Sequence, residues 1–315
     1  MYNRIAGNIR KSVILVLIFF VLTGVIGYFF GYFTGIGMWG LAAAVVFSMF
    51  MSWGSYFASD KIALSMSRAT PADETKFAQL HNVVEGLSIA ADMPKPRVYL
   101  IEDLAPNAFA TGRNPEHAAI ALTTGLVLKM DRDELEGVVA HELAHVKNRD
   151  TLVMTLAVTL VGVIVLLADW MMRAVWWGAG GSKKLLAPLA IVGIVLMITA
   201  PFFAQLLQFA ISRQREFLAD AEAVFLTRYP DGLIRALTKL RDDVTVVRSG
   251  SKATAHLWIE DPNARHAHEG GSRVGKKGAW LNRLFDTHPP LDERIAALQS
   301  LAPQPAGAAT AGGTN

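Results

Sequence analysis

The chain has 315 residues, of which 52% are hydrophobic and only 18% are charged, and its mean hydropathy is +0.33. Soluble globular domains carry about 25% charged residues, so this composition favours a membrane protein. The net charge of +3 comes without a dense Lys/Arg stripe, which predicts basic loops on the cytoplasmic side of a membrane and argues against a nucleic-acid partner. The absence of cysteine excludes disulfides, thiolate metal sites and cysteine nucleophiles.

The first long apolar run extends from residue 12 to residue 59 without a charged side chain. As a single helix it would be about 72 Å long, whereas the hydrocarbon core of a bilayer is about 30 Å thick. We therefore predict a transmembrane hairpin over residues 12–58, with its turn at residues 34–37. A second span directly after the first also argues against a cleaved signal peptide.

Gly27, Gly31 and Gly35 recur at every fourth position from the first predicted span into the turn that follows it. Small residues at this spacing let two membrane helices approach closely. The alternative is that these glycines reflect the general composition of membrane spans. The sequence alone leaves both interpretations open.

Residues 60–150 are predicted to form the first part of a domain outside the bilayer. Thr70 and Pro71 resemble the N-cap and the first residue of a helix. Strand-like pieces follow at residues 97–101, 107–111 and 117–123. Asp131 and Glu134 form a capping-box pattern, which predicts the start of a further helix.

A second hairpin is predicted over residues 151–211, where two uncharged runs flank a shorter polar segment. That segment contains Arg173, Lys183 and Lys184. These basic residues leave open whether the second hairpin crosses the bilayer completely.

About four spans place residues 60–150 and residues 212–302 on the same side of the bilayer as the N-terminus. Basic residues near the N-terminus and after both hairpins predict that this side is cytoplasmic. Residues 261–278 form a basic, Gly-rich loop to which no role is assigned. Residues 303–315 are of low complexity and are predicted to be a disordered tail.

The helix predicted after the capping box contains the sequence HELAH at residues 141–145. On a helix, His141 and His145 differ by about 40° in direction and about 6 Å in height, so both imidazoles can reach one zinc ion. Glu142 points too far from that position to be a ligand, but it can hydrogen-bond a water there, as in the H-E-x-x-H pattern of zinc peptidases. Two ordinary helix histidines are the alternative interpretation.

A hydrolytic zinc site needs a third protein ligand and an open position for water. The candidates for this ligand are Glu216, Asp220, Glu222, His256, His266, His268 and His288. If the second hairpin returns the chain to the same membrane face near residue 212, Glu216 can meet the two histidines. Asp220, four residues later, can accept a hydrogen bond from the outer nitrogen of a ligand imidazole.

Two other functions fit this pattern less well. An intramembrane protease would hold its histidine motif within the bilayer, but charged residues on both sides of residues 141–145 make this position costly. A zinc carrier would place ionisable ligands inside its spans, and the predicted spans contain none. A purely structural zinc site would fill its fourth position with another protein ligand.

The chain contains four motifs in this order: NAFATG at 107–112, HELAH at 141–145, REFLAD at 215–220 and FDTHPPLDERI at 285–295. Together they resemble the HtpX family of membrane zinc metalloproteases, which is related to the CAAX prenyl endoprotease. The resemblance covers nearly the whole chain. It implies one zinc ion held by His141, His145 and Glu216, with Glu142 as catalytic base. It also implies a multi-pass protein of the bacterial inner membrane, with a cytoplasmic active site and both termini cytoplasmic, that responds to stress.

The resemblance extends to two further parts of the site. NAFATG resembles an edge strand that pairs with an extended substrate peptide, with Asn107 and Ala108 on it. His288 is either a turn residue ahead of a short helix or a donor that stabilises the oxyanion of the tetrahedral intermediate.

The expected fold is therefore an α-helical integral membrane protein of about four transmembrane helices, with a cytoplasmic α+β zincin-like (gluzincin) domain built from two segments. The expected function is that of a zinc metalloendopeptidase that cleaves misfolded or damaged membrane proteins in quality control. Polypeptide substrates and the lipid bilayer are its expected partners. The sequence does not determine cleavage specificity or oligomeric state.

Overall fold

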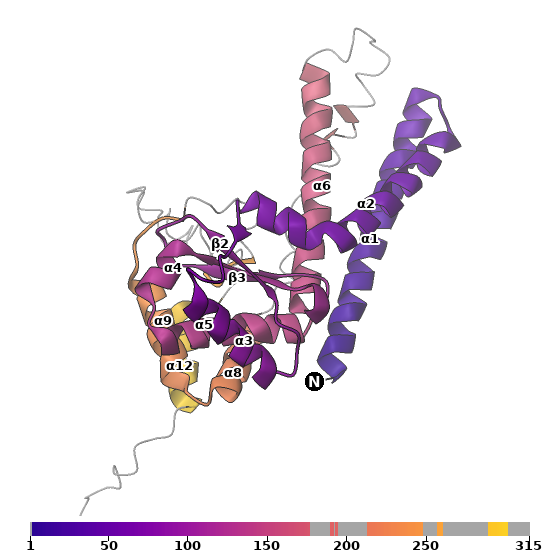
Figure 1. Ribbon diagram of the computed structural model, residues 1–315. Helices are drawn as coiled ribbons and strands as arrows, with labels where there is room; N and C mark the ends of the chain where they lie inside the picture. Colours follow the sequence, from indigo (N-terminus) through magenta and orange to yellow (C-terminus); the bar gives the residue numbers. More distant parts are fainter. Residues whose placement is uncertain are drawn as a thin grey trace, which may run out of the picture.

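The computed structural model (Figure 1) describes residues 2–176, 190–191, 193–194, 213–247, 257–260 and 289–301. In these ranges the chain is rich in helix and contains a four-stranded sheet. Long helices extend from one side of an α/β region, in which shorter helices surround the sheet (Figure 1).

Two N-terminal helices, α1 (Tyr2–Thr34) and α2 (Met38–Met66), are long and apolar enough to cross a bilayer. They pack against each other, and the chain reverses between them at the predicted turn. Large apolar side chains on both helices point outward, and Val21 and Trp39 are 67% and 78% exposed. An apolar surface of this extent is expected where side chains contact lipid.

The glycines of α1 allow close packing against α2. A Cβ atom on Gly27 would lie 2.2 Å from the Cβ of Ala44, and one on Gly31 would lie 2.1 Å from the carbonyl oxygen of Gly37. Gly35 serves the turn instead, because its φ of +81° is a conformation that other residues rarely adopt. The close-approach interpretation therefore holds for two of the three glycines.

A third long helix, α6 (Asp150–Trp176), packs against both α1 and α2. Phe19 of α1 shares an apolar cluster with Leu160 and Ile164 of α6. In Figure 1, α6 extends away from the sheet on the same side of the molecule as the first two helices. Most of the predicted return of the second hairpin, including Lys183 and Lys184, lies outside the described residues.

The sheet has the strand order β1-β2-β4-β3. Its strands are β1 (Thr70–Pro71), β2 (Arg97–Ile101), β3 (Ala108–Thr111) and β4 (Ala119–Thr123). β2 and β4 are parallel, whereas β3 runs antiparallel to β4, with Ala108 opposite Leu122. β3 is therefore an edge strand of this sheet.

The prediction that Thr70 and Pro71 begin a helix is wrong. Thr70 pairs with Leu100 and Pro71 with Tyr99, so both residues form the edge strand β1, and the next helix begins at Ala78. Proline has no backbone N–H group to donate. It is compatible with an edge strand because no neighbouring strand on the open side needs that donor.

The helices around the sheet come from both sides of α6. They are α3 (Ala78–Ala90), η1 (Pro115–His117), α4 (Thr124–Lys129) and α5 (Arg132–Lys147) before it, and α8 (Arg213–Thr227), α9 (Pro230–Asp242) and α12 (Leu291–Leu301) after it. α5 is central and packs against α3, α8, α9 and β3. Val138 of α5 shares one apolar core with Leu237 of α9 and Leu298 of α12.

The predicted capping box at the start of α5 is confirmed. The Glu134 amide donates to the Asp131 carboxylate at 2.9 Å, and the Asp131 amide donates to the Glu134 carboxylate at 2.8 Å. We expect Asp131→Ala to lower the free energy of unfolding by about 1 kcal/mol, because one amide of the first turn loses its acceptor. Thermal unfolding of the full chain in detergent measures this loss.

Asp133→Ala is the matched control for this prediction, because it removes the same charge from the same turn without removing a cap. An equal destabilisation by Asp133→Ala would contradict the capping explanation.

Candidate active site and metal centre

α5 presents His141 and His145 on one buried face. The two side chains are 1% and 8% exposed, and their rings are perpendicular with centroids 4.8 Å apart. Their Nε2 atoms lie 3.2 Å from each other. Both imidazoles thus point toward the same position, as the spacing of four residues on a helix predicts.

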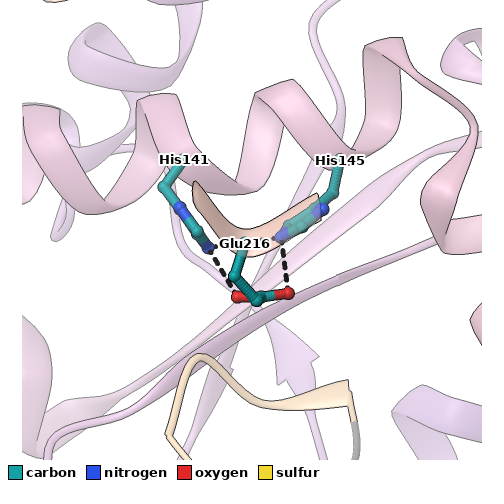
Figure 2. Close-up of side chains that lie close together, drawn as sticks. All are labelled: His141, His145 and Glu216. Atoms are coloured by element: carbon teal, nitrogen blue, oxygen red, sulfur yellow. Dashed lines mark hydrogen bonds and ion pairs between the residues drawn. The ribbon is translucent and has the colours of Figure 1, made fainter. Parts of the chain in front are cut away.

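Glu216 of α8 reaches the same position, and Figure 2 shows its carboxylate beside the ends of both imidazoles. One carboxylate oxygen lies 3.6 Å from Nε2 of His141 and the other lies 3.6 Å from Nε2 of His145. The three side chains form a group whose ligand atoms all lie within 4.8 Å of one another. Ligand atoms at tetrahedral zinc lie about 3.4 Å apart for bonds of about 2.0–2.1 Å, so two imidazoles and one carboxylate in this arrangement fit a zinc ion.

Asp220, one helical turn after Glu216, contacts the outer side of His141. Its Oδ1 atom lies 2.9 Å from Nδ1 of His141. A carboxylate on this nitrogen fixes the tautomer and leaves Nε2 directed at the proposed ion. Burial and the charge of Arg294 lower the pKa of His141, but the hydrogen bonds to Asp220 and Glu216 outweigh them and raise this pKa to about 9.

Arg294 of α12 completes this side of the site and was not anticipated from the sequence. It is fully buried and donates to both carboxylate oxygens of Asp220, at 2.9 Å and 2.7 Å. Burial opposes ionisation of Asp220, yet the charges of Arg294 and His141 lower its pKa below the usual range. Arg294 lies within the motif FDTHPPLDERI, which was the available indication of its importance.

Asp150 holds the second histidine in the same way and was also missed. Its Oδ2 atom lies 3.2 Å from Nδ1 of His145, while its Oδ1 atom accepts from Asn8 at 2.7 Å and from Arg215 at 3.3 Å. Asp150 is the first residue of α6, and Asn8 belongs to α1. The outer nitrogen of each imidazole thus contacts a separate carboxylate, that of Asp220 or that of Asp150. The Asp150 carboxylate is also hydrogen-bonded to the first long helix.

Glu142 lies in the same cavity as the two histidines and is buried. Burial raises the pKa of Glu142, and the neighbouring histidines act in the opposite direction. Its carboxylate also accepts a hydrogen bond from the backbone of Ala110 in β3. The side chain is therefore held between the two histidines and the edge strand.

Asn107 and Ala108 lie at the start of β3, as predicted, but their polar groups are already bonded within the chain. The Ile259 amide donates to the carbonyl oxygen of Ala108 at 2.9 Å. The Asn107 amide side chain donates to the carbonyl oxygen of Glu260 at 2.8 Å. Residues 257–260 therefore cover β3, the edge strand at which a substrate peptide was expected to pair.

Among the described residues, neither Asp220 nor Glu222 is part of the three-residue group. Glu222 accepts a hydrogen bond from Asn148 at 2.6 Å, on the other side of α5. His256, His266, His268 and His288 lie outside the described residues.

Residues 74–302 match the family described as peptidase family M48. The chain belongs to this family. It is 42% identical to a protease HtpX homolog of Caldanaerobacter subterraneus subsp. tengcongensis over 96% of this chain and 98% of that protein. It is 40% identical to a protease HtpX homolog of Streptococcus pneumoniae over 96% of this chain and 100% of that protein.

The solved structure of S. mikatae Ste24p aligns over 95% of this M48 chain and over 67% of the Ste24p chain, with 19% sequence identity and a TM-score of 0.48. Membership of M48, together with full-length HtpX relatives, makes this chain a metalloprotease and confirms the family resemblance. It also implies a metal, which in M48 is typically zinc, and the donor set described above suits it. Polypeptides are its substrates, and the two apolar N-terminal helices mark it as a membrane protein.

Proposed function

We propose that this M48 chain is a membrane-embedded zinc endopeptidase in which His141, His145 and Glu216 hold one zinc ion. The observation that carries the proposal is the convergence of these three buried side chains from α5 and α8. Asp220 and Asp150 hold the outer nitrogens of the two imidazoles, so both rings keep their Nε2 atoms directed at the ion.

Glu142 is the proposed general base. A zinc ion held by these residues would act as a Lewis acid for the scissile carbonyl and for the attacking water. Glu142 takes the proton of the attacking water and passes it to the leaving amine. Its place in the same cavity as the ligands supports this role. His288, which lies outside the described residues, stays our proposal for a donor to the oxyanion.

We further propose that catalysis takes place at the cytoplasmic face of the bacterial inner membrane. The proposed arrangement has transmembrane hairpins at 12–58 and 151–211, catalytic segments at 60–150 and 212–302, and a tail at 303–315. The packing of α6 against α1 and α2 supports a bundle of about four spans. Basic residues in the N-terminal segment support a cytoplasmic orientation for both termini.

The proposed substrates are misfolded or damaged membrane proteins, cleaved in quality control. The support is the near full-length similarity to HtpX homologs. The position of α5 against the sheet and between α3 and α8 supports cleavage beside the membrane instead of within it.

Zinc stoichiometry and casein cleavage, measured on the purified full chain in detergent, test the proposal. We expect about one zinc ion per chain and loss of cleavage on treatment with a chelator, restored by added zinc. Glu216→Ala should lose zinc and activity together, because two imidazoles alone form an incomplete site. Full zinc retention in this variant would show that the third ligand has been chosen wrongly.

Glu222→Gln is the matched control on the same helix. Its side chain meets Asn148 and not the histidines, and glutamine keeps the oxygen that accepts this hydrogen bond. Zinc content and activity should stay at the wild-type level.

A further inference from the structure

Residues 257–260 run along the open edge of β3. Successive contacts join Asn107 to Glu260, Ala108 to Ile259 and Phe109 to Trp258, so the two segments are antiparallel. The Ile259 amide donates to the Ala108 carbonyl oxygen at 2.9 Å, although residues 257–260 form a turn and bends and do not form a regular strand. The Ile259 carbonyl oxygen accepts from Arg294 at 3.3 Å.

Trp258 anchors this segment in an apolar cluster directly beside the proposed metal site. Its ring meets that of Phe109 edge-to-face at a centroid distance of 5.0 Å, and Met154 of α6 belongs to the same cluster. Trp258 also lines the cavity that contains His141 and Glu142. This cavity has a volume of about 10 Å³, which is room for about one water molecule and not for a peptide.

The indole of Trp258 is fully buried, yet its Nε1–H group has no hydrogen-bond partner within the described part of the chain. A buried donor without an acceptor is unfavourable, so this position is less stable than the burial of the ring alone suggests. Within the described residues, the segment is held by apolar packing and a few hydrogen bonds, which a strand paired to the same edge of β3 can replace.

We propose that residues 257–260 occupy the substrate cleft as an internal pseudosubstrate, and that the pocket of Trp258 receives a large apolar side chain of the substrate. This inference rests on the proposed endopeptidase function. β3 has β4 on one side, so its other edge can accept one strand only, and a peptide would need the same Ala108 carbonyl oxygen. The segment must therefore move away from β3 before a peptide can pair there.

A reversible cross-link tests the proposal, and the chain suits it because it contains no cysteine of its own. Asn107→Cys and Glu260→Cys are combined in the full chain that also carries Glu142→Gln, so that binding is measured without cleavage. The probe is fluorescein-labelled casein, followed by fluorescence anisotropy in detergent. We expect oxidation to weaken binding at least tenfold and reductant to restore it.

The two single-cysteine variants show what each substitution does without the cross-link, and oxidation should not change their binding. Equal binding by the oxidised and the reduced double variant would overturn the proposal. Failure of the two cysteines to cross-link, measured by mass spectrometry, would contradict the pairing itself. The proposed function is tested separately, because absence of casein cleavage by the wild-type chain would refute it. The binding measurement itself does not depend on cleavage.

A second pair of variants tests the pocket. Trp258→Ala should raise kcat/KM for short peptides at least tenfold, because the segment loses its anchor, whereas Trp258→Phe should stay within threefold of wild type. Ser/Gly decapeptides with one phenylalanine should be preferred at least tenfold over those with aspartate at the same place. Equal cleavage of both peptides, or no gain for Trp258→Ala while it unfolds at the wild-type temperature, would contradict the role assigned to Trp258.

Discussion

Glu142→Gln is expected to reduce casein cleavage by about 10²–10⁴-fold, the usual contribution of a positioned general base. Glutamine has nearly the same shape but cannot take a proton from water. The three proposed ligands are unchanged in this variant, so zinc should remain at about one ion per chain. Cleavage rate and zinc content are measured on the same purified sample, because only the combination separates loss of the base from loss of the metal.

Glu136→Gln serves as the control for this substitution. Glu136 lies on the same helix, but its side chain is partly exposed and pairs with Arg132 at 2.9 Å. Its replacement should leave cleavage within about twofold of wild type, since an exposed ion pair of this kind contributes little to stability. Cleavage by Glu142→Gln within tenfold of wild type would refute the assignment of the base.

Arg294→Met is expected to destabilise the protein by about 3–5 kcal/mol, because it leaves the carboxylate of Asp220 buried without its cationic partner. The affinity for zinc should also fall, by about 10–100-fold, since Asp220 then holds His141 less firmly. Thermal unfolding in detergent measures the first effect, and competition with a chelator measures the second.

Two comparisons isolate this ion pair. Arg241→Met removes an arginine whose partners, Asp242 and Asp292, are exposed, and it should change stability by less than about 1 kcal/mol. The double variant Arg294→Met/Asp220→Leu should be less destabilised than the sum of its two single variants, because it leaves no unpaired buried charge. Strict additivity would show that the two side chains do not act as a pair.

The parts of the site predicted from sequence depend on short-range geometry. The capping box fixes the start of α5, and the helical repeat then places His141 and His145 on one face, so residues close in sequence suffice for both. The choice of Glu216 needed one more assumption, that the chain returns to the same face after α6. The structure brings Glu216 to the histidines, although most of the return itself lies outside the described residues.

Arg294 was missed because it acts over a long sequence separation, since it lies 74 residues from Asp220. Asp150 is only five residues from His145, but the hydrogen bond that joins it to Asn8 spans 142 residues. No periodicity connects such pairs, because each contact is created by packing of separate helices. The error at Thr70 and Pro71 is of another kind, since proline is suited both to a helix start and to an edge strand.

The position of residues 257–260 could not be predicted for a similar reason. Leu257, Trp258 and Ile259 form a short apolar run with no repeat that would mark a strand or a helix. Their place is determined by the open edge of β3 and by the apolar cluster around Phe109. An edge strand identifies a surface that can be paired, but not which segment pairs with it.

The hydrogen bond between Asn8 and Asp150 has a consequence for any attempt to prepare a water-soluble version of the enzyme. A fragment beginning at residue 60 would retain the histidines and Glu216, but it would lack the amide that donates to Asp150 at 2.7 Å. Of its partners in the described part of the chain, Asp150 would then keep Arg215 and His145. Removing the first two helices would therefore alter the surroundings of the His145 imidazole, one of the three proposed zinc ligands.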